Sequence, residues 1–164
     1  MYNYGRTIKF MDKIASFQVN HNKLKKGIYI SREDMGIITY DLRMKMPNTN
    51  DLLSNSAIHT IEHLFASYVR NSLYKNNIIY FGPMGCRTGM YFIVRDLQHK
   101  NAIELIKQSI LFILNFEGEI PGCSSVECGN YKEHSLEQAK REAKMYYDEI
   151  KDWTVQKLDY TFSA

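Results

Sequence analysis

The sequence predicts one α+β domain in which helices pack on one face of a mostly antiparallel β-sheet. Segments rich in β-branched and aromatic residues and segments of helical periodicity are interleaved along the chain and joined by short connections. The chain has 164 residues, enough to bury a single sizeable core, and no long linker rich in proline, glycine or serine divides it. We therefore draw no internal boundary and treat residues 1–164 as a single domain.

The composition excludes several classes of protein. A hydrophobic fraction of 45%, with 12 Tyr, 8 Phe and only 3 Pro, is typical of a globular chain and not of a disordered or fibrous one. Lys and Arg number 21 against 18 Asp and Glu, and these charges are scattered, so the sequence indicates no nucleic-acid stripe and no polybasic membrane anchor. No apolar run approaches the roughly 18 residues of a membrane span, and none has the form of a signal peptide. Three cysteines, an odd number, fit a reducing compartment, so we expect a cytoplasmic protein whose partner is a small molecule or another protein.

The expected strands lie at 37–45, 77–81 and 90–95. Each of these segments combines β-branched and aromatic residues, and the first approaches strict alternation. We expect three or four strands in total.

Three segments have the apolar spacing of a helix, at 56–73, 101–116 and 135–153. Ser56 is the expected N-cap of the first segment, and Gly118 follows the end of the second. The third opens with Ser135-Leu136-Glu137-Gln138, which has the form of a capping box. These helices would cover one face of the sheet.

The strongest signal for chemistry is His59-Thr60-Ile61-Glu62-His63 in the first helix. At about 100° per residue, both histidines and the glutamate project over one narrow sector of the helix. Two imidazoles one turn apart can grip a metal ion, and the carboxylate beside them can move a proton near it. A helix face with two incidental histidines is the alternative. A peptidase of the H-x-x-E-H type would need a further carboxylate ligand and a longer chain. We favour a metal site.

A third metal ligand must come from elsewhere in the chain, because a catalytic metal usually takes three protein ligands. Cys128 is one candidate, since the glycine after it allows close approach of the backbone. Cys123 could serve instead, and a buried free cysteine without metal is an equally good reading of Cys128.

Cys86 stands in a glycine-flanked turn between two expected strands, at 82–89. Reactive side chains often sit on such loops, and Arg87 or a more distant arginine could lower the pKa of the thiol. A small residue that merely fills the turn is the alternative, which the residues alone favour slightly. His99 and His134 have polar neighbours, so we expect both to face solvent.

Five motifs follow one another along the chain. They are 16–21, the pair 40–43 and 46–48, then 58–64, 83–89, and 128–131 ahead of 134–136. In this order they resemble the LuxS family of S-ribosylhomocysteine lyases. The resemblance covers most of the chain, and the five motifs together are far more specific than any one of them. About residues 1–14 look like an N-terminal extension of a single LuxS-like domain.

The resemblance implies an activity and a set of partners. The enzyme would be a homodimer that cleaves the thioether of S-ribosylhomocysteine, giving homocysteine and 4,5-dihydroxy-2,3-pentanedione, the precursor of the quorum-sensing signal autoinducer-2. It would depend on Fe(II), for which zinc or cobalt can substitute.

The resemblance also implies roles for particular residues. His59, His63 and Cys128 would bind the metal, and Glu62 and Cys86 would be the acid/base pair. The residues implied in substrate binding are Arg43, beside the Cys86 thiolate, and Ser16 and His21, donated across the homodimer interface.

Two positions depart from the family pattern. Tyr80 stands where an acidic residue is common, and Gly82 where serine is usual. A phenol is longer than a carboxylate, so we expect Tyr80 to turn away from the sugar. The alternatives for function are a non-catalytic metal-binding dimer, against which the retention of Glu62 and Cys86 argues, and a small metallohydrolase.

Overall fold

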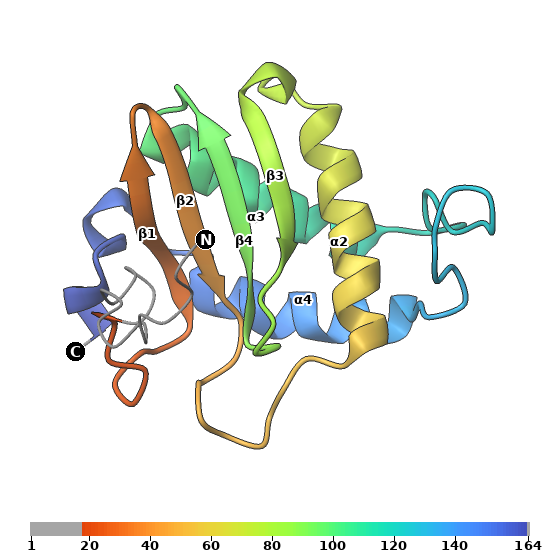
Figure 1. The fold of residues 1–164 in the computed structure, drawn as a ribbon, viewed down its shortest axis with the longest axis horizontal. Helices are drawn as coiled ribbons and strands as arrows, with labels where there is room; N and C mark the ends of the chain where they lie inside the picture. The colour runs from red at the N-terminus through yellow and green to blue at the C-terminus, as the bar shows by residue number, and fades with distance from the viewer. Residues whose placement is uncertain (1–17, 164) are drawn as a thin grey trace, which may run out of the picture.

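A four-stranded antiparallel sheet, in the order β1-β2-β4-β3, forms the framework of the protein. The structure, a computed structural model, describes residues 18–163. The strands are β1 (Gly27–Asp34), β2 (Ile37–Arg43), β3 (Ile78–Pro83) and β4 (Gly89–Arg95). Three helices cover one face of the sheet: α2 (Asn55–Arg70), α3 (His99–Asn115) and α4 (Leu136–Ile150) (Figure 1). Three short 3₁₀ helices complete the fold: η1 (Lys75–Asn77), η2 (Val155–Lys157) and η3 (Tyr160–Ser163). The predicted α+β class and the helices on one face are confirmed.

The core lies between the sheet and the three helices. Alternate residues of the central strands, such as Leu42 and Phe92, are buried toward the helices. Phe65 of α2 stacks on Phe81 of β3 with ring centroids 3.8 Å apart, and so joins the first helix to the edge of the sheet. Within residues 18–163, no helix is long and apolar enough to cross a membrane.

β1 was not among the expected strands. Only its first half is apolar, whereas Arg32 and Glu33 are exposed at the edge of the sheet. A register shift between Ile30 and Arg32 also interrupts the alternation that would have marked a strand. β2 ends at Arg43 instead of residue 45, because the backbone N–H groups of Met44 and Lys45 donate to the Thr88 carbonyl outside the ladder.

The helix ends differ from the expected ones by a few residues. The N-cap of α2 is Ser54, not Ser56, because the Ser54 hydroxyl accepts from the Ala57 N–H at 3.2 Å. Half of the expected capping box of α4 forms, since Ser135 accepts from the Gln138 N–H. The Gln138 side chain instead accepts from the hydroxyls of Ser54 and Ser56, which ties the start of α4 to the start of α2.

The C-terminal segment packs on β1 through a close approach at Gly27. α4 ends at Ile150, short of the predicted 153, and the Trp153 indole lies against the Gly27 backbone. Its Nε1–H donates to the Ile28 carbonyl at 2.9 Å, and the Tyr146 hydroxyl donates to the Gly27 carbonyl at 2.8 Å. A Cβ at Gly27 would overlap the indole ring, so only glycine permits this packing.

Replacing Gly27 by alanine should therefore destabilise the protein. The new methyl group must displace the indole and both hydrogen bonds near it, and we expect the free energy of unfolding to fall by about 1–3 kcal/mol. Urea denaturation followed by circular dichroism measures this change. Gly85→Ala is the matched control, because a Cβ at Gly85 meets nothing within 4 Å. Equal stability of the two variants would contradict the packing argument.

Candidate metal centre and active site

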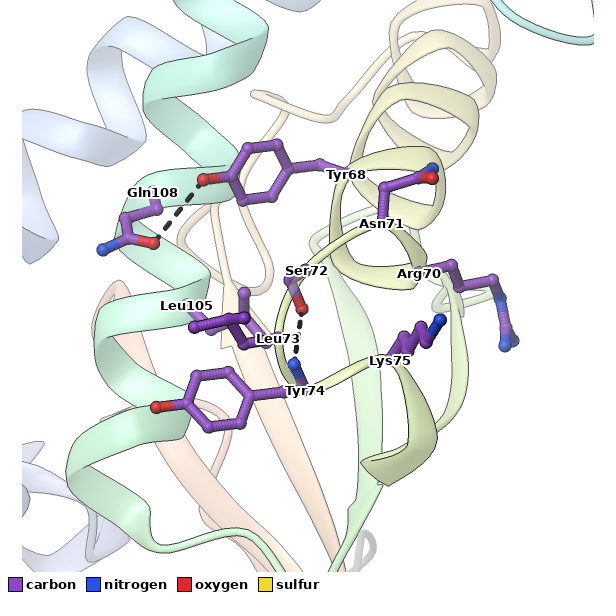
Figure 2. A pocket seen from close by; sticks show the side chains of 9 residues that line it. All are labelled: Tyr68, Arg70, Asn71, Ser72, Leu73, Tyr74, Lys75, Leu105 and Gln108. Atoms are coloured by element: carbon purple, nitrogen blue, oxygen red, sulfur yellow. Dashed lines mark hydrogen bonds between the residues drawn. The ribbon is translucent and has the colours of Figure 1, made fainter.

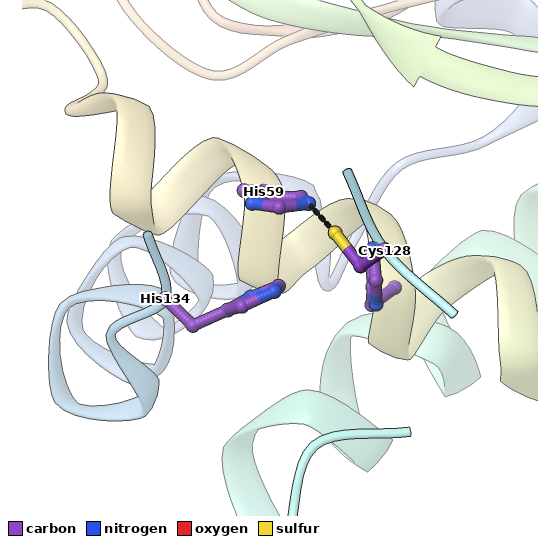
Figure 3. A group of neighbouring side chains, drawn as sticks. His59, Cys128 and His134 are labelled. Carbon is purple, nitrogen blue, oxygen red and sulfur yellow. Dashed lines mark hydrogen bonds between the residues drawn. The ribbon is translucent and has the colours of Figure 1, made fainter. Parts of the chain in front are cut away.

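Four side chains with metal-binding atoms meet between α2 and the connection from α3 to α4. They are His59, His63, Cys128 and His134, and one ligand atom of each lies within 4.8 Å of the others. The Cys128 Sγ lies 3.3 Å from His59 Nε2 (Figure 3). The helix thus supplies two imidazoles, as its spacing predicts, and the connection supplies the thiol.

Backbone carbonyls fix the tautomers of the two helix histidines. His59 Nδ1 lies 3.1 Å from the Glu133 carbonyl, and His63 Nδ1 lies 2.8 Å from the Pro121 carbonyl. A carbonyl can only accept, so each Nδ1 carries the proton and each Nε2 keeps its lone pair. This is the arrangement that orients histidine as a metal ligand, with the outer nitrogen held and the inner one free.

The donor set fits a divalent transition metal. Two neutral imidazoles and one thiolate suit zinc, iron or cobalt better than magnesium or calcium, which prefer oxygen. Of the two cysteines that the sequence left open, Cys123 is engaged elsewhere, since its thiol donates to the Tyr131 carbonyl at 3.1 Å. The geometry therefore favours Cys128 as the third ligand.

The expectation that His134 faces solvent is wrong. Its ring stacks on that of His59 with centroids 3.9 Å apart, and its Nε2 is buried without a hydrogen-bond partner in the described part of the chain. Thr60 explains the orientation. The Thr60 hydroxyl gives its own proton to the Ser56 carbonyl, so His134 Nδ1, 3.3 Å away, must be the donor to Thr60. Burial, followed by the nearness of the His59 and His63 imidazoles, lowers the pKa of His134 to about 4, so the ring is neutral at pH 7.

The angles between the imidazole rings indicate which histidines can bind one metal ion together. A nitrogen lone pair lies in the plane of its ring, and the planes of His59 and His63 are nearly perpendicular at 88°. The planes of His59 and His134 differ by only 24°, so their lone pairs run side by side and do not converge. His134 therefore buttresses His59 in this geometry. Sequence reasoning missed it because its contacts are with residues more than 70 positions earlier in the chain.

Glu62 lies on the same helix turn as the two histidines and is half-buried. Within residues 18–163, its carboxylate makes no hydrogen bond and no salt bridge. A carboxyl group without such partners is available for proton transfer beside the cluster.

A second group of candidate side chains surrounds the turn between β3 and β4. Cys86 Sγ lies 3.0 Å from Thr88 Oγ1 and 3.9 Å from Arg43 Nη1. Arg43 also donates to Thr88 Oγ1 at 2.5 Å. The structure thus selects the distant Arg43, and not the adjacent Arg87, as the arginine that contacts the thiol. Sequence reasoning did not single out Thr88.

These contacts favour the ionised form of Cys86. Partial burial alone would raise the pKa of the thiol, but the hydrogen bonds to Thr88 and the charge of Arg43 outweigh it and leave the pKa below its ordinary value. The thiol itself is exposed, so a substrate can reach it.

The remaining predicted residues have separate outcomes. Ser16 lies outside the described residues. His21 is half-buried, its Nδ1 lies 2.9 Å from the Val19 carbonyl, and its charge acts on Asp41 of the same protomer. His99 does not simply face solvent, because its Nδ1 lies 2.7 Å from the Tyr40 hydroxyl.

Tyr80 and Gly82, the two departures from the family pattern, are physically linked. Both lie on β3, and a Cβ at Gly82 would overlap the Tyr80 phenol. The phenol thus lies across the glycine, and a serine at 82 would displace it. Whether the phenol contacts a sugar stays a prediction.

A pocket at the C-terminal end of α2 carries none of this chemistry. Its lining includes Tyr68, whose hydroxyl points to Gln108, but no histidine, cysteine or carboxylate (Figure 2). The candidate site is therefore the cluster near the start of α2 together with the turn that carries Cys86.

Removing the proposed thiol ligand should remove the metal. We expect Cys128→Ala to lose most of its bound metal, because two imidazoles alone leave the shell incomplete. Elemental analysis of purified protein measures the stoichiometry, and Cys123→Ala is the matched control. Full metal in Cys128→Ala, with loss in Cys123→Ala, would identify the other cysteine as the ligand.

Comparison with known proteins agrees with this geometry. The family model of LuxS, described as S-ribosylhomocysteinase, matches residues 14–157. An S-ribosylhomocysteine lyase of Porphyromonas gingivalis is 47% identical over 157 residues, which cover 92% of this chain and 99% of the relative. Lyases of the same name from Borreliella burgdorferi and Finegoldia magna are 44% and 46% identical, again over 92% of this chain and 99% of each relative. On this evidence the chain belongs to the LuxS family.

Proposed function

We propose that this chain is a metal-dependent S-ribosylhomocysteine lyase. It cleaves the thioether of its substrate to homocysteine and 4,5-dihydroxy-2,3-pentanedione, the precursor of autoinducer-2, by successive aldose-ketose isomerisation and β-elimination. The names of the relatives and their near-complete coverage support this activity.

The contact of Cys86 with Arg43 and Thr88 carries the proposal. A non-catalytic metal-binding dimer would need the histidines and Cys128 but no exposed thiol with a lowered pKa. A metallohydrolase would use Glu62 to activate water and would likewise have no use for Cys86. A reaction that moves protons between carbon atoms uses both groups.

His59, His63 and Cys128 are the residues that would hold the metal, which we propose to be Fe(II), with zinc or cobalt able to replace it. When bound, such an ion supplies a Lewis acid that polarises the carbonyl of the opened sugar. Glu62 follows His59 by three residues, so its carboxylate lies next to the same region of α2.

The acid/base work falls to Cys86 and Glu62. In each isomerisation one group removes the proton from the carbon next to the carbonyl, and a proton returns to the former carbonyl carbon, so two rounds move the carbonyl from C1 to C3. Arg43 and Thr88 favour the ionised form of the Cys86 thiol before substrate arrives, which suits the first step.

The elimination needs no catalytic group beyond those already named. Once the ketone is at C3, the proton at C4 is acidic and a base removes it. The C4–H electron pair forms the C4–C5 double bond while the C5–S bond breaks and its pair leaves with sulfur. The homocysteine thiolate takes a proton, and the enol product rearranges to the diketone. No electron acceptor is required.

We further propose a cytoplasmic homodimer built from one LuxS-like domain per chain, with about residues 1–14 as an extension. All three cysteines are free, which suits a reducing compartment, and the family match begins at residue 14. In the dimer, Ser16 and His21 would contact substrate in the partner's site.

The direct test of the function is thiol release. Protein purified without oxygen and loaded with Fe(II) should liberate homocysteine from S-ribosylhomocysteine, and a thiol reagent measures the product. Cys86→Ala and Glu62→Gln should keep their metal and lose activity by a factor on the order of 100 or more, as expected for a general acid or base. Cys123→Ala serves as the control. Substantial turnover by either variant would sink the acid/base assignment.

Hybrid dimers test the shared site. His21→Ala and Cys86→Ala proteins should each be inactive, but a mixed dimer would have one site with both residues intact if His21 crosses the interface. After random exchange of equal amounts, about half of the dimers are mixed, and each of these has one of its two sites intact. About one quarter of wild-type activity should therefore be recovered. No recovery after subunit exchange, verified by mass spectrometry, would place His21 and Cys86 of the same chain in one site.

A further inference from the structure

Arg43 carries a charge that is almost completely buried. Its side chain is 3% exposed, and it is held on one side by Asp41 and on the other by Thr88 and Cys86. The Arg43 Nη2 lies 2.5 Å from Asp41 Oδ2. Nη1 is the nitrogen that faces Thr88 and the thiol. The position of Asp41 therefore sets the position of the guanidinium and of the Nη1 donor that faces the thiol.

A residue near the C-terminus fixes that carboxylate. The Tyr160 hydroxyl donates to Asp41 Oδ2 at 3.0 Å, to the same oxygen that pairs with Arg43. The other oxygen, Oδ1, is buried and has no hydrogen-bond partner among residues 18–163. Two donors on one oxygen therefore set the orientation of the carboxylate. The Tyr160 ring is itself held, because it stacks on Tyr29 of β1 with centroids 5.0 Å apart.

Tyr160 lies outside the segment that the family model matches, which ends at residue 157. Its role therefore follows from the contacts of this chain alone. η3, which begins at Tyr160, lies beside β1, the edge strand farthest from α2 (Figure 1).

We propose that Tyr160 is a positioning residue for the Cys86 thiolate, and that it acts through Asp41 and Arg43. The hydroxyl holds the Asp41 carboxylate, the carboxylate holds the guanidinium, and the guanidinium presents Nη1 to Thr88 and to the thiol. This inference rests on the proposed function for its catalytic consequence, but the chain of contacts can be tested on the thiol itself.

Electrostatics gives the sign of the effect. Burial raises the pKa of the Asp41 carboxyl, whereas Arg43 and the Tyr160 hydrogen bond lower it. Without the phenol, the carboxylate keeps only the donor from Arg43, so rotation about its Cβ–Cγ bond is less restrained. Arg43 then moves with the carboxylate, and the interaction of its buried guanidinium with the Cys86 thiolate becomes weaker. The pKa of Cys86 should therefore rise.

Other charged and titratable groups around this network are few. Tyr91 on β4 interacts with both Asp41 and Cys86, and it keeps its proton because burial raises its pKa. His21 acts on Asp41 from the N-terminal side, and Tyr146 of α4 interacts with Asp41 and Arg43. Ser31 of β1 also hydrogen-bonds to Tyr160. None of these groups replaces the donor that Tyr160→Phe removes from Asp41 Oδ2.

The experiment follows alkylation of Cys86 by iodoacetamide from pH 5 to pH 10 on the metal-loaded protein. Peptide mass spectrometry reports Cys86 separately from the other two cysteines. Tyr160→Phe removes only the hydroxyl and keeps the ring against Tyr29. Tyr147→Phe is the matched control, because Tyr147 packs on the core and lies outside this network. Thermal unfolding verifies that both variants are folded.

We expect the midpoint of the Cys86 profile to rise by about half a pH unit or more in Tyr160→Phe and to stay unchanged in Tyr147→Phe. At pH values below both midpoints, kcat for S-ribosylhomocysteine should fall by about threefold, with KM unchanged. A purely structural role would lower the melting temperature without moving the alkylation profile.

Two results would overturn the inference. An unchanged midpoint means that Tyr160 does not act on the thiol. A lower midpoint means that the negative charge of Asp41 mainly offsets the positive charge of Arg43 at the thiol. The Tyr160 hydroxyl would then raise the pKa of Cys86 by holding Asp41 in place, the opposite of the proposed effect. If the wild-type protein does not cleave S-ribosylhomocysteine at all, the proposed function fails, whereas the alkylation profiles still decide the role of Tyr160.

Discussion

The burial of the Arg43 charge is the constraint on which the turn that carries Cys86 depends. Taking a guanidinium out of water costs several kcal/mol unless its donors find partners. Here the two terminal nitrogens find partners in separate parts of the chain: Asp41 two residues earlier on β2, and Thr88 and Cys86 on the turn after β3. Nε is buried without a hydrogen-bond partner among residues 18–163. The pairing of Arg43 with Gly89 brings strand and turn together. The register of β2 and β4 and the shape of the turn must therefore all be correct before this charge can be buried, and the thiol gains a fixed cation only in that fold.

The geometry of the candidate metal cluster depends on backbone carbonyls. The connection between α3 and α4 has little regular structure, yet His59 and His63 each bond to one of its carbonyls through Nδ1. The same bonds leave both Nε2 atoms available for a metal. A third bond, from the Ser135 N–H to Thr60 Oγ1, fixes the point where the connection enters α4. The helix histidines therefore organise the segment that supplies Cys128, and ligand geometry and loop position are set together.

What the sequence predicts here follows from local periodicity, and what it misses follows from long-range contact. His59, Glu62 and His63 share a helix face because four residues make about one turn, so the cluster could be predicted. His134 could not, since its polar neighbours suggest solvent, whereas its stacking partner lies 75 residues earlier in the chain. β1 was missed because an edge strand with a bulge and a charged second half lacks alternation. Tyr160 gives no local signal, because its function depends on a carboxylate 119 positions away.

The contrast between an exposed thiol and a buried arginine suits a base that must be used repeatedly. In the proposed mechanism the thiolate has to reach carbon atoms of the substrate, and Cys86 is exposed. The Arg43 charge, which favours the ionised form of the thiol, acts more strongly where water is excluded, and Arg43 is buried. Arg87 is closer in sequence but exposed, and solvent would screen its charge. A reaction with several proton transfers and no redox step needs the same base restored after each transfer. A cation fixed by Asp41, itself held by Tyr160, provides an unchanging field for every one of them.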